Sequence, residues 1–361
     1  MDQIRKFRRI TMSAALVAAA GLGIAACTSS SNPTASTTSS HSGSACKSGA
    51  APGVAALPGY QVCLWAAATS TANHPDNVVI SGSNVFIGWQ NITAKDGTDI
   101  KTSTIAEYRT SGKLLKSWSV RGHTDGMRVD PTTHLLWVMC DEDGNPRLYT
   151  INPTGGSPTQ ITLPPTPHGG GFDDIQFVNG MAFIDASNPA LNGAGKNVFP
   201  ALYKVTLSGT HAVLTKVLMA DAKATTIIPP VSTVTLNLTD PDSMMVDSQG
   251  NLILDSQGDS EMLWIKNAGT PQQSVSVLTV GTQVDDTVFP SSAKGCILVA
   301  DNSSGVYSIC SDVWIPGSAY TDAPNDSGVI GFVGTLSLSS GLIQPIVVGI
   351  ANPHGMAFLP Q

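Results

Sequence analysis

One short segment recurs six times along the chain, and this recurrence predicts an all-β fold of the β-propeller type. In each copy a polar turn precedes a short run with alternating apolar residues, a pattern typical of strands joined by hairpins. The sequence shows no long amphipathic helix. We therefore expect six blades of four-stranded antiparallel sheet after a disordered N-terminal tether. The copies are anchored at Asp76, Asp125, Asp174, Asp242, Asp286 and His354.

The spacing of these anchors fits four-stranded blades, but the last copy is too short to form one. A four-stranded blade needs about 40 to 50 residues, and the two longer intervals contain polar insertions at 188–196 and 320–327. Further strand candidates are 104–108 with 114–120, 202–207 with 213–218, and 329–338 with 343–348, whereas 219–225 is a weak helix candidate. The last copy supplies only an inner strand. Residues 60–67 could add an outer strand, but two strands do not complete a blade, so five or seven blades stay open.

The N-terminus carries the pattern of a secretory signal. A basic opening precedes the apolar run of 10–27, ITMSAALVAAAGLGIAAC, in which small residues stand directly before Cys27. This arrangement resembles bacterial lipoprotein precursors, and the resemblance implies that Cys27 is lipidated and becomes the mature N-terminus. The alternative is an ordinary signal peptide with a chance cysteine.

The domain organisation follows from these features. We expect a signal peptide at 1–26, a lipidated cysteine with a flexible Ser/Thr-rich tether at 27–57, and the propeller at 58–361. A stretch with so little to bury cannot offset its ordering entropy. The predicted partner is the membrane, through the lipid on Cys27, and the predicted location is the extracytoplasmic face of the cell membrane.

Charge and cysteine content narrow the function further. A net charge of −7, with 12% charged residues, argues against nucleic-acid binding, which needs clustered Lys and Arg. Cys296 and Cys310 flank an apparent hairpin at equal offsets from its turn, so an oxidising exterior favours a disulfide there. Cys46 and Cys63 could form a second pair, which leaves Cys140 as a buried free thiol.

The repeat predicts that the anchors gather at one mouth of the central channel. Two carboxylates about 8 Å apart repel by about 2 kcal/mol at an effective dielectric constant near 20. A shared divalent cation such as Ca²⁺ or Mg²⁺ would relieve this repulsion, and raised pKa values are another route. The alternative is that each aspartate only caps its own turn. His74, His123 and His168 lie near the same loops.

The best copy, DPDSMMVDSQGNLILDS at 240–256, resembles the repeats of NHL proteins and of gluconolactonase-like, senescence-marker propellers. Residues 58–80 are also similar to the entry of quinone-binding sugar-dehydrogenase propellers. The gluconolactonase resemblance implies an axial divalent metal held by carboxylates and an asparagine, with a carboxylate base. The chain departs from it because 74–77 contains no glutamate, although Asp242, Asp286 and Asn77 could imitate such a site.

Three functions remain open at this point. The first is a cell-surface lipoprotein whose propeller binds a ligand or partner protein at the channel mouth, without evident catalysis. The second is a divalent-metal-dependent lactonase or esterase. The third is a structural envelope protein. The sequence has no nucleophile elbow, no zinc-protease helix motif, no P-loop and no dinucleotide-binding glycine motif.

Overall fold

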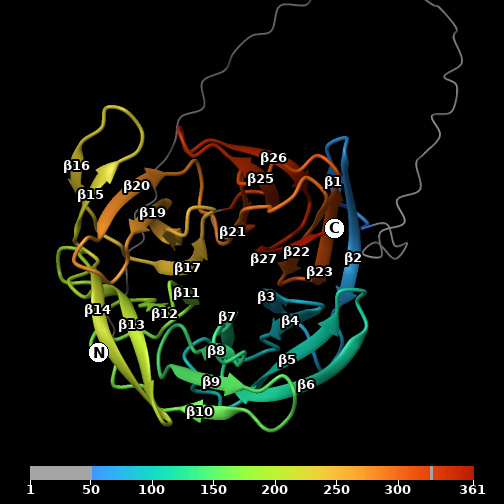
Figure 1. Cartoon of the computed structure of the whole chain (residues 1–361), viewed down its shortest axis with the longest axis horizontal. Helices are drawn as coiled ribbons and strands as arrows, with labels where there is room; N and C mark the ends of the chain where they lie inside the picture. Colours follow the sequence, from blue (N-terminus) through green and yellow to red (C-terminus); the bar gives the residue numbers. More distant parts are fainter. Residues whose placement is uncertain (1–50, 326–327) are drawn as a thin grey trace, which may run out of the picture. The chain divides into compact units, whose positions relative to one another are not determined.

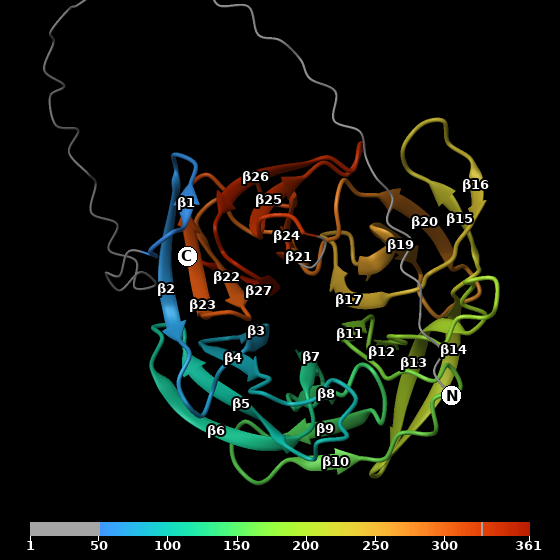
Figure 2. The same ribbon diagram turned by 180° about the vertical axis from the view of Figure 1, so that it is seen from behind.

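Six small sheets surround a common centre in the part of the chain that the structure describes, which confirms the β-propeller prediction (Figure 1, Figure 2). The structure is a computed structural model that describes residues 51–325 and 328–361. Within these ranges there is no α-helix, and one 3-10 turn occurs at Gln257–Asp259. No helix in these ranges is long and apolar enough to cross a membrane. The predicted signal peptide, Cys27 and most of the predicted tether lie outside the described residues.

The first three blades are four-stranded antiparallel sheets whose strands follow chain order from the centre outwards. The first contains β3 (Pro75–Ser81), β4 (Asn84–Trp89), β5 (Thr102–Arg109) and β6 (Leu114–Arg121). The second contains β7 (Thr124–Val129), β8 (Leu136–Cys140), β9 (Arg147–Ile151) and β10 (Thr159–Ile161). The third contains β11 (Ile175–Val178), β12 (Met181–Asp185), β13 (Pro200–Ser208) and β14 (His211–Met219).

The fourth blade carries an extra hairpin. Its sheet contains β17 (Pro241–Val246), β18 (Leu252–Ser256), β19 (Glu261–Lys266) and β20 (Ser274–Thr279), and is extended by β15 (Lys223–Thr226) and β16 (Thr233–Thr235). β15 pairs in parallel with β20. The helix candidate at 219–225 was therefore wrong. Its apolar residues Ala220 and Ala224 are buried between blades while the backbone enters a strand.

The last two blades each combine strands from both ends of the described chain. The fifth contains β21 (Thr287–Val288), β24 (Ala319–Ala323), β25 (Phe332–Leu336) and β26 (Ile343–Val348), with β1 (Ala55–Ala56) on its edge. The sixth contains, from the centre outwards, β27 (Pro353–Pro360), β22 (Gly295–Asp301), β23 (Gly305–Ser311) and β2 (Tyr60–Ala67). The described residues thus form six blades, and the last is complete because β22 and β23 supply its middle strands.

This arrangement corrects one expectation. The copy anchored at Asp286 was expected to form a hairpin like the preceding copies, but β21 pairs with β24, and β22 belongs to the next blade. The reason is that β22 is apolar on both faces and is buried between two blades. Ile297 packs towards the fifth blade, whereas Leu298 packs towards the first.

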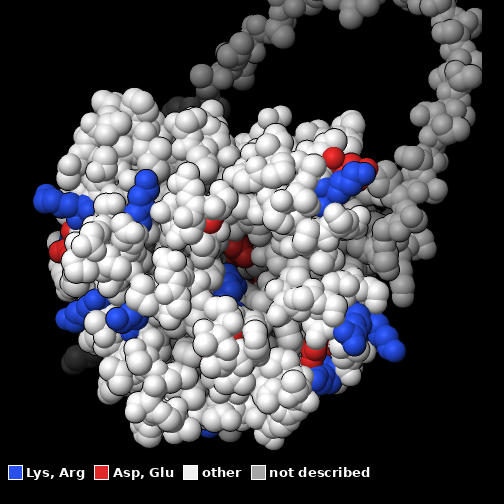
Figure 3. Space-filling model, in the orientation of Figure 1, with Lys and Arg blue, Asp and Glu red and all other residues white. Residues whose placement is uncertain are grey.

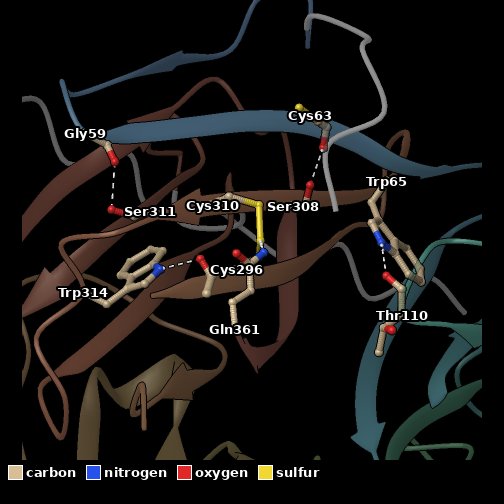
Figure 4. Close-up of a disulfide and its surroundings, with 11 residues drawn as sticks. Gly59, Cys63, Trp65, Thr110, Cys296, Ser308, Cys310, Ser311, Trp314 and Gln361 are labelled. Atoms are coloured by element: carbon tan, nitrogen blue, oxygen red, sulfur yellow. Dashed lines mark hydrogen bonds between the residues drawn. A yellow bond between two sulfur atoms is a disulfide. The ribbon is translucent and has the colours of Figure 1, made fainter. Parts of the chain in front are cut away.

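A disulfide joins the two middle strands of the sixth blade (Figure 4). Cys296 and Cys310 are directly opposed in the register of β22 and β23, and the predicted bond between them is present. Cys140 is a buried free thiol, as expected. The suggested pair of Cys46 and Cys63 involves Cys46, which lies outside the described residues.

The core is divided among the blade interfaces. Each pair of neighbouring blades encloses its own apolar cluster, so the middle strands are buried on both faces. Trp314 joins strands from the two ends of the described chain. It packs edge-on against Tyr60, Tyr320 and Phe358, and its ring N–H donates to the Gly295 carbonyl at 2.9 Å. Packing between neighbouring blades therefore fixes the positions of the loops around the centre.

Candidate functional site

A polar cavity of about 490 Å³ lies at the centre of the ring, where the loops before the inner strands meet the segments that follow the second strands. Figure 3 shows a hollow at the centre of the molecule with acidic and basic side chains in it. Carboxylates dominate the wall of the cavity. They are Asp76, Asp125, Glu142, Asp143, Asp173, Asp174, Asp240, Asp242 and Asp285.

The structure brings most of the predicted anchors together. Asp76, Asp125, Asp174, Asp242 and His354 line the same cavity, although they are far apart in the sequence. Whether a cation binds at such an axial ring stays a prediction. His74 and His123 also line the cavity, whereas His168 is fully buried beside the Gly171 carbonyl and does not.

Asp286 does not line the cavity, and its neighbour Asp285 does so instead. The Asp286 carboxylate accepts hydrogen bonds from the backbone N–H groups of Thr287 at 2.7 Å and Met356 at 2.8 Å. It thereby joins the fifth blade to the inner strand of the sixth. The aspartate has a backbone role here, as the turn-capping alternative proposed, but the bond also crosses to another blade.

Asp174 joins the third and fourth blades in the same way. Its carboxylate accepts from the backbone N–H of Ile175 at 2.7 Å and of Met244, in the fourth blade, at 2.9 Å. The guanidinium of Arg128 donates to Asp174 at 3.0 Å and to the Met244 carbonyl at 2.7 Å. Asp174 and Asp286 are therefore held in backbone and guanidinium contacts, unlike the other cavity carboxylates.

His123, Asp125 and Glu142 converge at the wall between the first two blades. Each offers one ligand-type atom, and these three atoms lie within 4.8 Å of one another. His123 and Asp125 flank Thr124, which is opposite Cys140 in the register of β7 and β8, and Glu142 follows Cys140 by two residues. The hairpin itself therefore brings the three side chains to one place.

The opposite part of the cavity contains a second histidine–carboxylate pair. The Nδ1 atom of His354 is 2.6 Å from Asp285 Oδ2 and 3.7 Å from Asp76 Oδ1. Ser243 donates its hydroxyl to Asp242 at 2.9 Å and lies 3.1 Å from Asp285 Oδ1. A histidine held by a carboxylate in this way is an arrangement suited to proton transfer.

Burial dominates the electrostatics of the cavity. It raises the pKa of Asp125, Asp173 and Asp242 well above the ordinary value, and the neighbouring carboxylates add to the effect. Burial likewise raises the pKa of Asp76 to about 7 and lowers the pKa of His123 to about 4. His123 is therefore neutral at neutral pH, and several carboxylates are favoured in their protonated form.

Glu142 differs from these carboxylates because Lys95 lies beside it. The ammonium of Lys95 is 2.6 Å from Glu142 Oε1. Burial opposes ionisation of Glu142, but the charge and hydrogen bond of this ammonium, together with a hydrogen bond from Asp173, outweigh it and lower the pKa of the glutamate. Glu142 is therefore favoured in its ionised form, whereas several neighbouring carboxylates are favoured in their protonated form.

Sequence reasoning missed several cavity residues. Gln90, Glu142, Ser187, Gln257 and Asn302 each follow the end of a second strand by one or two residues. Their signal was present, because the second strand of each hairpin returns to the centre and delivers the residue after it to the cavity. Lys95 comes from the long segment between β4 and β5, for which the repeat offers no rule.

No protein-family model and no curated protein matches the sequence. Solved structures resemble the fold. Virginiamycin B lyase from Staphylococcus aureus matches with a TM-score of 0.46 and 14% identity, covering 84% of this chain and 94% of that one. The periplasmic gluconolactonase of Pseudomonas aeruginosa matches with a TM-score of 0.41 and 11% identity, over 79% and 88%. A protein of unknown function from Bacteroides caccae matches with a TM-score of 0.46 and 8% identity, over 80% and 87%. Likeness at this level carries no argument about activity, so function has to be argued from the site.

Proposed function

We propose that this protein binds a small polar ligand, uncharged or cationic, in the central cavity of its propeller. The main support for this proposal is the charge of the side chains that line the cavity. Among the described residues that line it, Lys95 is the only lysine or arginine, and Glu142 already occupies its ammonium. An anionic ligand would therefore find no unpaired lysine or arginine among these lining residues, whereas hydroxyl and ammonium groups would find oxygen acceptors.

A thermal-shift and calorimetric screen tests this proposal, with chelator present so that metal effects are removed. Putrescine, glucosamine and glucose are the cationic and neutral probes, and glucose 6-phosphate is the anionic one. We expect at least one of the first three to raise the melting temperature and the phosphate to have no effect. Asp242→Asn should weaken the binding by about tenfold, because a ligand donor left without its acceptor in a buried site costs about 1–3 kcal/mol.

The exposed Asp221 provides the matched control, since Asp221→Asn makes the same chemical change outside the cavity. Equal weakening by both substitutions would contradict the proposed site. So would tight binding of glucose 6-phosphate, or no stabilisation by any cationic or neutral probe.

The second candidate is a divalent-metal-dependent lactonase or esterase. The contact of 2.6 Å between His354 and Asp285, in the same cavity as His123, Asp125 and Glu142, favours it. In the same screen, lactone hydrolysis would be followed with and without chelator. Hydrolysis that is unaffected by His354→Gln would remove this candidate.

We also propose that the protein is held at the extracytoplasmic face of the cell membrane by a lipid on Cys27. The lipoprotein-like run before Cys27 and the Ser/Thr-rich segment after it support this. Cys27→Ser should move the protein from the membrane fraction to the soluble one, as measured by fractionation and immunoblotting. Cys140→Ser is the control, and unchanged membrane retention of Cys27→Ser would refute the anchor.

A further inference from the structure

We propose that His123, Asp125 and Glu142 form a binding site for a divalent transition-metal ion, Mn²⁺ or Zn²⁺, in the cavity wall between the first and second blades. This site differs from an axial ring of anchors, since it uses one anchor together with residues of the same hairpin. It does not depend on the proposed organic ligand, because the ion and its three ligands are sufficient for binding.

Two buried polar atoms point to a missing partner in this cluster. His123 is 6% exposed and Asp125 is 3% exposed. Within the part of the chain that the structure describes, the Nε2 atom of His123 and the Oδ2 atom of Asp125 have no hydrogen-bond partner. An orphaned polar atom in such surroundings costs about 1–3 kcal/mol, and a bound cation would satisfy both atoms at once.

The hydrogen bonds of His123 define which nitrogen faces the cluster. Nδ1 lies 3.1 Å from the Thr93 carbonyl oxygen and 2.9 Å from Thr93 Oγ1. The Thr93 hydroxyl donates its proton to the Gln90 carbonyl at 2.7 Å, so both partners of Nδ1 are acceptors. Nδ1 must then carry the proton, which leaves Nε2 with a lone pair.

That lone pair faces another acceptor. Nε2 of His123 is 3.6 Å from Oδ1 of Asp125, which is too far for a hydrogen bond. Ligand atoms about 2.1 Å from a tetrahedral ion lie about 3.4 Å apart. The spacing already present is therefore close to that of two ligands of one ion.

Asp125 is oriented by a chain of amides. Gln90 donates to Asp125 Oδ1 at 3.1 Å, and Asn302 donates to Gln90 at 2.7 Å. Asn302 in turn is 3.1 Å from His74 Nδ1. Outer partners of this kind orient metal ligands, and here they leave Oδ2 of Asp125 free to bind.

The set of donor atoms indicates the class of metal. One imidazole nitrogen and two carboxylates, with further positions open to the cavity, suit Zn²⁺ or Mn²⁺. Ca²⁺ prefers six to eight oxygen ligands. Lys95 binds one oxygen of Glu142, but a carboxylate has further lone pairs with which to bind an ion.

Isothermal titration of the full chain with metal alone, after chelation and without organic ligand, tests the site. We expect one Mn²⁺ or Zn²⁺ per chain, bound more tightly than Ca²⁺. His123→Ala and Glu142→Gln should each weaken binding by about 100-fold or more, given the 10–100-fold losses known for outer-sphere partners. His211→Ala removes an exposed histidine of β14 and should leave binding unchanged.

Asp242→Asn separates this site from an axial ring. It should weaken metal binding far less than Glu142→Gln does, whereas at an axial site Asp242→Asn would cause the larger loss. If His123→Ala does not fold, pulsed electron paramagnetic resonance of Mn²⁺ bound to the unaltered protein should detect one coordinated imidazole nitrogen. Absence of that nitrogen signal, metal binding that survives Glu142→Gln, or preferential Ca²⁺ binding lost in Asp242→Asn would each overturn the site.

Discussion

Asp285 and Asp286 show that neighbouring, identical residues serve different purposes here. Asp285 faces the cavity beside His354, whereas Asp286 holds the backbone of the next blade. The third and fifth repeat copies each contain two consecutive aspartates, so alignment on a single position could not separate the two roles. Only the register of the inner strand decides which carboxylate enters the cavity.

The buried carboxylate of Asp286 should make stability depend on pH. Burial raises its pKa from the ordinary 3.8 to about 7, with Arg128 acting against that shift. The folded state therefore binds a proton that the unfolded state has lost above about pH 4, and this stability disappears as the pH rises through about 7. The wild type should lose about 2 to 3 kcal/mol of unfolding free energy between pH 5 and pH 8 from this group.

Asp286→Asn should reduce this dependence by the contribution of that group, because an amide does not ionise while the other buried carboxylates still do. Urea unfolding at pH 5 and pH 8, in chelator, would measure it. The variant should also be less stable at pH 5, since one of the N–H groups of Thr287 and Met356 loses its acceptor. An identical pH dependence in Asp286→Asn and in the wild type would show that this carboxylate does not control it, and Asp221→Asn is the control.

Hairpins supply the cavity in a regular way. Each inner strand presents a residue from the loop before it, and the second strand of every blade except the fifth presents residues just after it. Glu142 reaches His123 because β7 and β8 pair through Thr124 and Cys140. A glutamate that seems remote from the anchors in the sequence is thus delivered to the cavity by one hairpin register.

Strand assignment was less regular in the fifth copy. β21 has only two residues, and the chain leaves it for the next blade instead of turning back. The sequence of β22 resembles a second strand of its own copy, because both situations require a short apolar run between turns. Pairing with β27, from the far end of the chain, decided between them.

The ring as a whole depends on its closing blade. β27 lies between the fifth and first blades, pairs with β22 and receives the backbone contact of Asp286. β2, from the other end of the described chain, covers β23 on the outside. Ring closure thus protects sheet edges that would otherwise be exposed.

Truncation after residue 351 should abolish cooperative folding. The shortened chain lacks β27, so β22 becomes an open edge and the clusters at two blade interfaces lose members such as Met356. Urea unfolding followed by tryptophan fluorescence, together with limited proteolysis, would show a broad transition and rapid cleavage. Removal of Gln361 alone is the control. A truncated chain with an unchanged midpoint would contradict this view of closure.

Local signals in the sequence were enough to predict the all-β class, the six-fold repeat, most hairpins and the Cys296–Cys310 bond, because turns and apolar alternation are encoded within a few residues. They also identified five of the six anchors, together with His74 and His123, as residues near the cavity that they line. Only the folded molecule showed which strands share the closing blade, that Asp285 replaces Asp286 in the cavity, and that Glu142 and Lys95 join His123. These outcomes depend on pairings between distant segments and on strand register, where a shift of one residue sends a side chain to the opposite face.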